Sequence, residues 1–198
     1  MAETRYVALG DSYTIGTAVA EDASFPSQLA AAVPELELVA NLGVDGYTTA
    51  DLIRDELPAV ARLDPGFATL LIGVNDAVQG VPLERYETNV TTILDALLAR
   101  LPPGRLVVVT VPDYTVTPHG ADYGDPVVRS AAIRAHNAAM TRLATGRGLA
   151  VVDIHDVSLE AAHDRTLVAD DGLHPSGAQY ARWVERLVPV VTAALAAD

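Results

Sequence analysis

Residues 5–12 read Arg-Tyr-Val-Ala-Leu-Gly-Asp-Ser, a largely apolar run that ends in a glycine and two polar residues. A short apolar run of this kind is typical of a strand buried on both faces, as the strands of parallel sheets are. Further runs of similar character recur along the chain. We expect strands over residues 5–9, 36–40, 67–72, 106–111 and 149–154.

Helical patterns fill the stretches between these runs. We expect helices over residues 26–33, 48–57, 83–101 and 127–145, and a last helix that begins near Pro175. Thr48 and Asp51 are spaced like a capping box, which supports a helix start there. Pro58 is expected to end or kink that helix, because proline lacks the N–H that a helix interior needs.

Strands that alternate with helices indicate a parallel sheet covered on both faces. We therefore expect an α/β fold, a three-layer α/β/α sandwich around a five-stranded parallel, flavodoxin-like sheet. The whole chain, residues 1–198, is expected to form a single domain. Periodicity does not give the order of the strands.

Composition excludes several kinds of chemistry. The sequence contains no cysteine, so a thiol nucleophile, a disulfide and a cysteine-ligated zinc site are ruled out. It also contains no lysine, which excludes a Walker phosphate loop and a Schiff-base mechanism. No two histidines have the spacing of a metal site on a helix. We expect neither a metal nor an organic cofactor.

Charge and hydropathy restrict the partners. The formal net charge is −13, which disfavours nucleic acid and stable attachment to an anionic membrane. No apolar run approaches the ~18 residues of a membrane span, and the start of the chain lacks the features of a signal peptide. We expect a cytoplasmic protein with a small-molecule partner. The sequence does not indicate an oligomeric state.

Polar and glycine-rich segments follow three of the expected strands. These segments are Gly10–Gly16, Asn41–Gly46 and Gly73–Asp76, and a fourth, Asp170–Pro175, precedes the last helix. In a parallel sheet the carboxyl ends of the strands lie at one edge, where ligands bind. The sequence therefore predicts one site built from both ends of the chain.

The four segments resemble the signature blocks of the SGNH hydrolases, also called GDSL-type esterases. Ser12, Gly43, Asn75 and His174 match the four residues that name the family, and Asp171 matches its usual acid. The resemblance covers essentially the whole chain. It implies a serine esterase that hydrolyses carboxylic esters through an acyl-Ser12 intermediate. It further implies an oxyanion hole made of the Ser12 N–H, the Gly43 N–H and the Asn75 side chain.

The residue types agree with this chemistry. A serine hydroxyl becomes a nucleophile only when a neighbouring base takes its proton, and a histidine suits that role near neutral pH. A carboxylate must orient the imidazole and stabilise the imidazolium formed during attack. Asp171 is expected to do so from the loop that carries His174, with Asp170 as the competing candidate.

Structural interpretations stand beside the catalytic ones. Ser12 is also suited to cap a helix, and Gly43 and Gly46 are both suited to a turn with positive φ. We interpret Gly46 as the turn residue and Gly43 as the oxyanion donor. Asp76 is expected to cap a helix or to support Asn75.

The substrate pocket is expected to include Tyr13, where the family usually has leucine, and two residues of the long segment after the fourth strand, Tyr114 and Val116. Tyr123 is a candidate cover for the pocket, and His119 a further candidate contact. A thioesterase or acyltransferase would use the same triad. A noncatalytic flavodoxin-like binding module would have the same sheet.

Overall fold

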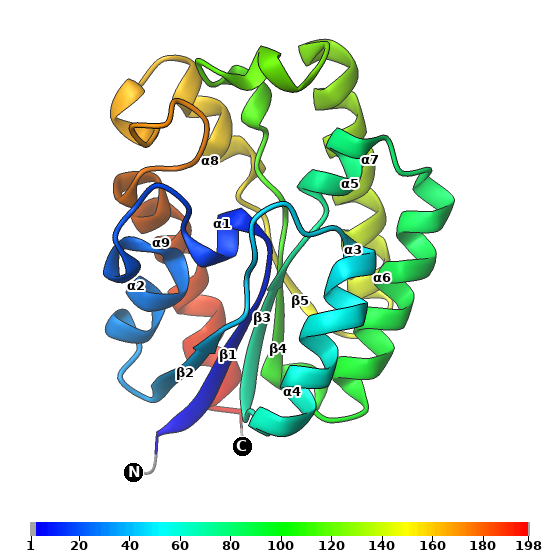
Figure 1. Ribbon diagram of the computed structural model, residues 1–198. Coiled ribbons are helices and arrows are strands. Elements are labelled where there is room, and N and C mark those ends of the chain that lie inside the picture. Colours follow the sequence, from blue (N-terminus) through cyan, green and yellow to red (C-terminus); the bar gives the residue numbers. More distant parts are fainter. Residues whose placement is uncertain (1–2, 198) are drawn as a thin grey trace.

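The computed structural model describes residues 3–197, and its five strands form one all-parallel sheet (Figure 1). The strand order is β2-β1-β3-β4-β5, which is the flavodoxin-like order. The strands are β1 (Thr4–Gly10), β2 (Leu36–Asn41), β3 (Phe67–Leu71), β4 (Leu106–Val109) and β5 (Ala150–Val152). The fold class expected from the sequence is confirmed.

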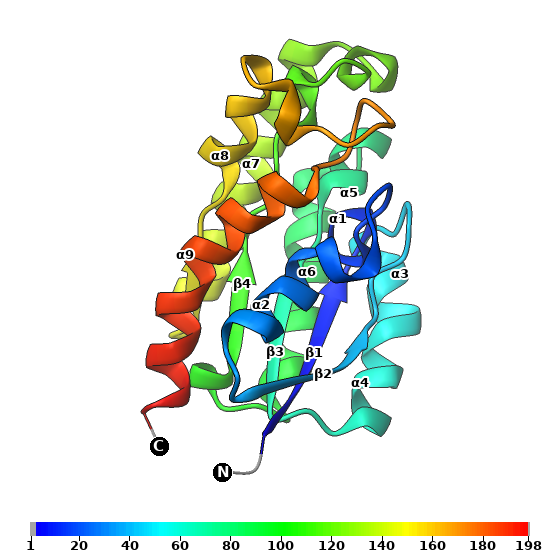
Figure 2. The same cartoon turned by 90° about the vertical axis from the view of Figure 1, so that its left-hand side faces the viewer.

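Helices cover both faces of the sheet. They are α1 (Ser12–Ile15), α2 (Phe25–Ala32), α3 (Thr49–Asp51), α4 (Leu57–Leu63), α5 (Val74–Gln79), α6 (Leu83–Leu98), α7 (Pro126–Thr145), α8 (His155–Leu159) and α9 (Gly177–Leu195). Helices α2 and α9 pack on one face, and α4, α6 and α7 on the other (Figures 1 and 2). Within residues 3–197, no helix has both the length and the apolar character needed to cross a membrane.

Strand β1 shows why the sheet is covered on both sides. Tyr6 and Ala8 belong to the core beneath α2 and α9, whereas Val7 and Leu9 belong to the core beneath α6 and α7. All four are fully buried. Successive side chains of a strand point to opposite faces, so a continuous apolar run needs two covering layers.

Strands β4 and β5 end earlier than the apolar runs predict. Beyond β4, the Asn137 side chain of α7 accepts a hydrogen bond from Val111 N–H at 2.8 Å and donates to the Val111 carbonyl at 2.9 Å. A side chain thus satisfies the backbone groups that a neighbouring strand would otherwise pair with. The apolar run continues to Val111, but the backbone hydrogen bonds between neighbouring strands do not.

The helix expected over residues 48–57 is longer and less regular than predicted. Thr48 and Asp51 form the expected capping box. Pro58 does not end the helix: a π-helical turn, η2 (Leu52–Glu56), leads into α4, which continues to Leu63. Proline is tolerated in the first turn of a helix, and the change from π to α geometry places Pro58 in that position.

Candidate active site

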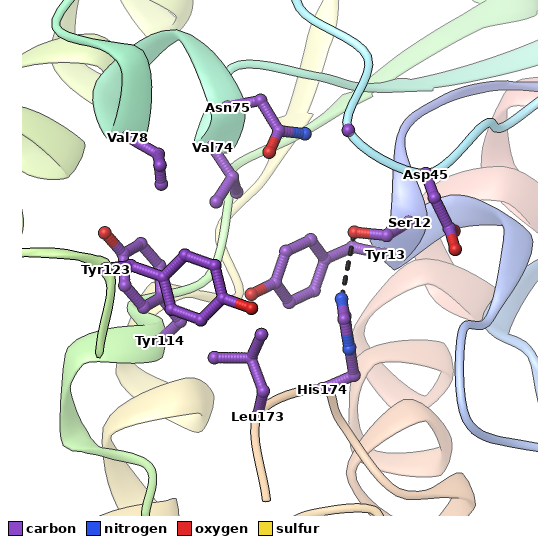
Figure 3. A pocket seen from close by; sticks show the side chains of 11 residues that line it. Ser12, Tyr13, Asp45, Val74, Asn75, Val78, Tyr114, Tyr123, Leu173 and His174 are labelled. Atoms are coloured by element: carbon purple, nitrogen blue, oxygen red, sulfur yellow. Dashed lines mark hydrogen bonds between the residues drawn. The ribbon is translucent and has the colours of Figure 1, made fainter. Parts of the chain in front are cut away.

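The site lies where the strand order reverses, between the carboxyl ends of β1 and β3. Ser12 follows β1, Asn75 follows β3, and His174 precedes α9. Together they line a cavity of about 180 Å³ (Figure 3). The full lining is Ser12, Tyr13, Asp45, Gly46, Val74, Asn75, Val78, Tyr114, Tyr123, Leu173 and His174.

Three polar side chains form a continuous chain of hydrogen bonds. Ser12 Oγ lies 3.0 Å from His174 Nε2, and His174 Nδ1 lies 2.6 Å from Asp171 Oδ2. In Figure 3 the imidazole of His174 points at the Ser12 hydroxyl. Asp171 also accepts the backbone N–H groups of Leu173 and His174 through Oδ1, at 2.9 and 3.0 Å. Among the hydrogen bonds of residues 3–197, the His174 ring pairs with Asp171 and not with Asp170, the competing candidate.

These contacts fix the charge of Asp171. Partial burial alone would raise the pKa of its carboxyl group, but the hydrogen bonds from His174 and Leu173 outweigh burial and hold the pKa below its ordinary value. Asp171 is therefore a carboxylate at neutral pH. A carboxylate in this position orients the imidazole and favours its protonated form.

A tight turn brings Ser12 to the rim. Gly10 ends β1 with φ +154°, and a Cβ there would lie 2.0 Å from the Leu71 carbonyl oxygen. Asp11 then caps α1, since its side chain accepts the Tyr13 N–H at 3.0 Å. Ser12 becomes the first residue of α1, with only 6% of its surface exposed. A larger residue than glycine would not fit at this strand end.

Asn75 is held with one amide hydrogen spare. Its Nδ2 donates to the Tyr47 carbonyl at 2.9 Å, and a primary amide nitrogen carries two hydrogens. The neighbouring Asp76 accepts the backbone N–H of Thr49 at 2.9 Å and its hydroxyl at 2.6 Å, which ties α5 to α3. Asp76 thus supports the helix that carries Asn75.

The two glycines after β2 occupy different places. Gly43 is outside the cavity lining, its N–H donates to Asn41 Oδ1 at 3.2 Å, and a Cβ would lie 2.6 Å from the Ile15 nitrogen. Gly46 lines the cavity with φ +78°. Within the described part of the chain, neither Gly46 N–H nor Ser12 N–H has a recorded protein acceptor. Gly46, and not Gly43, therefore shares the cavity lining with Ser12 and Asn75.

Aromatic and aliphatic side chains form most of the cavity wall. The Tyr13 ring lies against His174, with ring centroids 5.1 Å apart, and Tyr114 meets Tyr123 edge to face at 6.0 Å. Tyr13 and Tyr114 are thus at the cavity as the sequence predicts, whereas Val116 is not part of its lining.

Sequence reasoning missed the aliphatic part of the wall, namely Val74, Val78 and Leu173. Val74 and Leu173 directly precede Asn75 and His174, and Val78 lies one helical turn after Val74. This proximity to the signature residues is the signal that could have found them.

His119 packs beside the triad loop and not in the cavity. Its ring pairs with Asp122 at 2.9 Å and lies where a Cβ on Gly172 would be, at 2.3 Å. The backbone N–H of His119 donates to the Gly172 carbonyl at 3.0 Å. Among the described residues, no three carboxylate or imidazole side chains gather as they would to hold a metal ion.

Comparison with known proteins assigns the family. The model of the GDSL-like Lipase/Acylhydrolase family matches residues 8–182. A G-D-S-L family protein from Veillonella parvula has a similar structure, with a TM-score of 0.78 and 17% identity over 95% of this chain and 98% of that one. The acetyl xylan esterase Axe2 from Geobacillus stearothermophilus has a TM-score of 0.75 and 19% identity, over 96% of this chain and 95% of that chain.

The esterase EstA from Pseudoalteromonas gives a TM-score of 0.73 at 16% identity, over 98% of this chain and 99% of that chain. No curated protein matches this chain in sequence. The family model spans most of the sequence and includes every residue of the hydrogen-bonded chain described above. The chain therefore belongs to the GDSL-like lipase and acylhydrolase family.

Proposed function

We propose that the chain is a serine esterase that hydrolyses carboxylic esters through an acyl-Ser12 intermediate. The observation that carries this proposal is the hydrogen-bonded series Asp171, His174 and Ser12. Ser12 and His174 come from opposite ends of the chain and meet at one cavity, and Asp171 lies behind His174. Family membership independently supports a hydrolase that acts on esters.

Acylation begins with proton transfer from Ser12 Oγ to His174 Nε2 as the oxygen attacks the ester carbonyl carbon. His174 then carries a positive charge, which the Asp171 carboxylate stabilises at Nδ1. The carbonyl π bond breaks and its electron pair becomes an oxyanion. When the tetrahedral intermediate collapses, the alkoxide leaves with the proton from Nε2.

Deacylation repeats these steps with water. His174 Nε2 takes a proton from a water molecule, whose oxygen attacks the acyl carbon. The second intermediate expels Ser12 Oγ, which recovers its proton from His174. The products are a carboxylic acid and free enzyme.

The oxyanion is stabilised by three donors: the Ser12 N–H, the Gly46 N–H and the spare Asn75 amide hydrogen. Gly46 replaces Gly43 in this role because Gly46 lines the cavity and its N–H has no recorded acceptor in residues 3–197. Gly43 instead allows the loop after β2 to approach α1 closely. Preorganised donors of this kind stabilise charge that develops in the transition state.

The cavity size favours a short acyl group. The cavity has a volume of about 180 Å³. Its wall of tyrosine, valine and leucine side chains suits an apolar chain. We expect the highest kcat/KM for short acyl chains, with a decline as the chain lengthens.

A series of chromogenic esters tests the proposal. Wild type should hydrolyse the short esters, and Ser12→Ala should lose about 10⁶ in kcat while remaining folded by circular dichroism. A matched thioester and an added acceptor alcohol complete the series. Faster hydrolysis of the thioester than of the ester would assign a thioesterase, and faster acyl transfer to the alcohol than to water would assign an acyltransferase. A folded Ser12→Ala variant with appreciable activity would contradict the nucleophile assignment.

A further inference from the structure

A buried glutamate contacts the strand end that leads to the nucleophile. Glu56, the last residue of η2, is 3% exposed. Its Oε2 accepts the Gly10 N–H at 3.0 Å, two residues before Ser12. Its Oε1 is buried and has no hydrogen-bond partner within the described chain. The catalytic steps above do not use this side chain.

A π-helical turn carries this glutamate, which lies four residues after the buried Leu52. Leu57 N–H bonds to the Leu52 carbonyl, five residues back, so the turn holds one residue more than an α-helical turn. The preceding residues Arg54 and Asp55 pair with each other in solvent, while Leu52 and Glu56 are buried. Such turns are frequent at functional sites.

The surroundings of Glu56 are acidic. Asp11, the N-cap of α1, is fully buried with Oδ2 unpartnered. Asp55 adjoins Glu56 on η2, and Asp76 on α5 is fully buried near Asp11. Tyr86 of α6 is a further buried titratable group close to Asp11 and Asp76. None of the recorded ion pairs of residues 3–197 involves Glu56 or Asp11.

The electrostatics follow from this environment. Burial, and then the charges of Asp11 and Asp55, raise the pKa of Glu56 to about 9, although the Gly10 N–H lowers it. Burial also raises the pKa of Asp11 to about 8. An unpaired charge in such a place is costly, so a buried carboxyl group without a cation holds its proton.

We propose that Glu56 is a positioning residue that, as an uncharged carboxylic acid, fixes the β1–α1 turn and thereby Ser12. Its carbonyl oxygen accepts the Gly10 N–H, and its hydroxyl is the second, unpartnered oxygen. Ionisation would place a negative charge beside Asp11 without a cation. The carboxylate would accept the Gly10 N–H more strongly, but its repulsion of Asp11, which caps α1, would displace the turn that carries Ser12. The proposal rests on the proposed role of Ser12.

Glu56→Gln tests this idea, because glutamine keeps the carbonyl acceptor and cannot ionise. At pH 7.5 the variant should match wild type, whereas Glu56→Ala should lower kcat. Between pH 7.5 and pH 10 wild type should lose about tenfold in kcat relative to Glu56→Gln, as Glu56 ionises around pH 9. KM should change little, because the cavity lining does not include Glu56. Glu185→Gln, on the exposed face of α9, is the matched control and should keep the wild-type profile.

Thermal unfolding gives a readout that does not need esterase activity. The folded state raises the pKa of Glu56, so the unfolded state releases its proton first and wild-type stability falls from about pH 4.5 to about pH 9. The melting temperature of Glu56→Gln should therefore rise relative to wild type across that window. If the protein hydrolyses no ester but the difference in melting temperature between Glu56→Gln and wild type still grows with pH, the proposed esterase function is wrong and the proposal of an uncharged Glu56 stands.

Two results would overturn the proposal. Parallel pH profiles of wild type and Glu56→Gln in both kcat and melting temperature would show that Glu56 does not titrate in this way. A folded Glu56→Gln that is inactive at pH 7.5 would show that the site requires the charged form.

Discussion

Two carboxyl groups from different regions lie one contact away from the Ser12 segment, Asp171 through His174 and Glu56 through Gly10. Asp171 lies in the partly exposed loop before α9 and accepts hydrogen bonds from His174 and two backbone N–H groups. Glu56 lies in the buried turn before α4 and accepts one, from Gly10. The pKa of Asp171 is lowered and that of Glu56 is raised. The number of donors and the access to solvent, and not the residue type, decide the charge.

The difference in charge corresponds to a difference in the role of the two carboxyl groups. Asp171 must be an anion because it stabilises a histidine cation that forms during each turnover. Glu56 makes a permanent contact with the backbone, which a neutral carbonyl oxygen serves without charge. An amide substitution should therefore cause a large loss of activity at Asp171 and little change at Glu56 at pH 7.5.

The largest expected effect in this comparison is that of Asp171→Asn. Loss of the carboxylate leaves the imidazolium unstabilised and can select the wrong tautomer, so kcat should fall by about 10⁴. The corresponding Glu56→Gln should lose little at pH 7.5. Steady-state kinetics on a short ester check both, with Asp170→Asn as the neighbouring control. Similar losses in Asp171→Asn and Asp170→Asn would remove Asp171 from the triad.

Asn75→Ala should have the next largest effect. Its spare amide hydrogen is expected to serve only the transition state, so kcat should fall by about 10² to 10³ with KM nearly unchanged. Melting temperature should be recorded as well, because Asn75 also bonds to the Tyr47 carbonyl. An increase in KM alone would indicate that Asn75 binds substrate and does not stabilise the oxyanion.

The smallest expected effect is that of a substitution at Gly43, the first of the two glycines after β2. In Gly43→Ala the added Cβ would lie 2.6 Å from the Ile15 nitrogen and 2.7 Å from the Asp11 carbonyl oxygen, so the backbone must shift. Such overpacking costs about 1–3 kcal/mol, which lowers the melting temperature by several degrees.

Gly104→Ala is the control, because a Cβ at Gly104 meets nothing within 4 Å. A Gly43→Ala variant with normal stability and a large loss of kcat would return the oxyanion role to Gly43.

Much of the fold could be predicted because the signals are local. Each strand is a continuous apolar run, and the runs alternate with helical patterns. The strand ends were less certain, since the side chain of Asn137 replaces a strand partner at Val111. That contact joins residues far apart in the sequence and leaves no periodic trace.

The candidate site could be predicted in part. Ser12, Asp171 and His174 sit in recognisable segments, and the structure brings them together. The choice between Gly43 and Gly46 depends on the path of a loop, which Asn41 directs by accepting the Gly43 N–H and donating to the Thr14 carbonyl. No pattern within the segment contains that information.

Glu56 was not predictable for a different reason. Residues 52–58 read as an ordinary helix that approaches a proline, in which a glutamate is expected to face solvent. Packing of η2 against the strand end at Gly10 buries this side chain, and no local pattern shows that packing.

The most direct measurement of the central claim is the intact mass of the protein after reaction with an organophosphonate probe. The account predicts a single adduct, located on Ser12 by peptide mapping, and its loss in His174→Ala but not in His163→Ala. An adduct on another residue, or labelling of Ser12 that persists unchanged without the His174 imidazole, would contradict it.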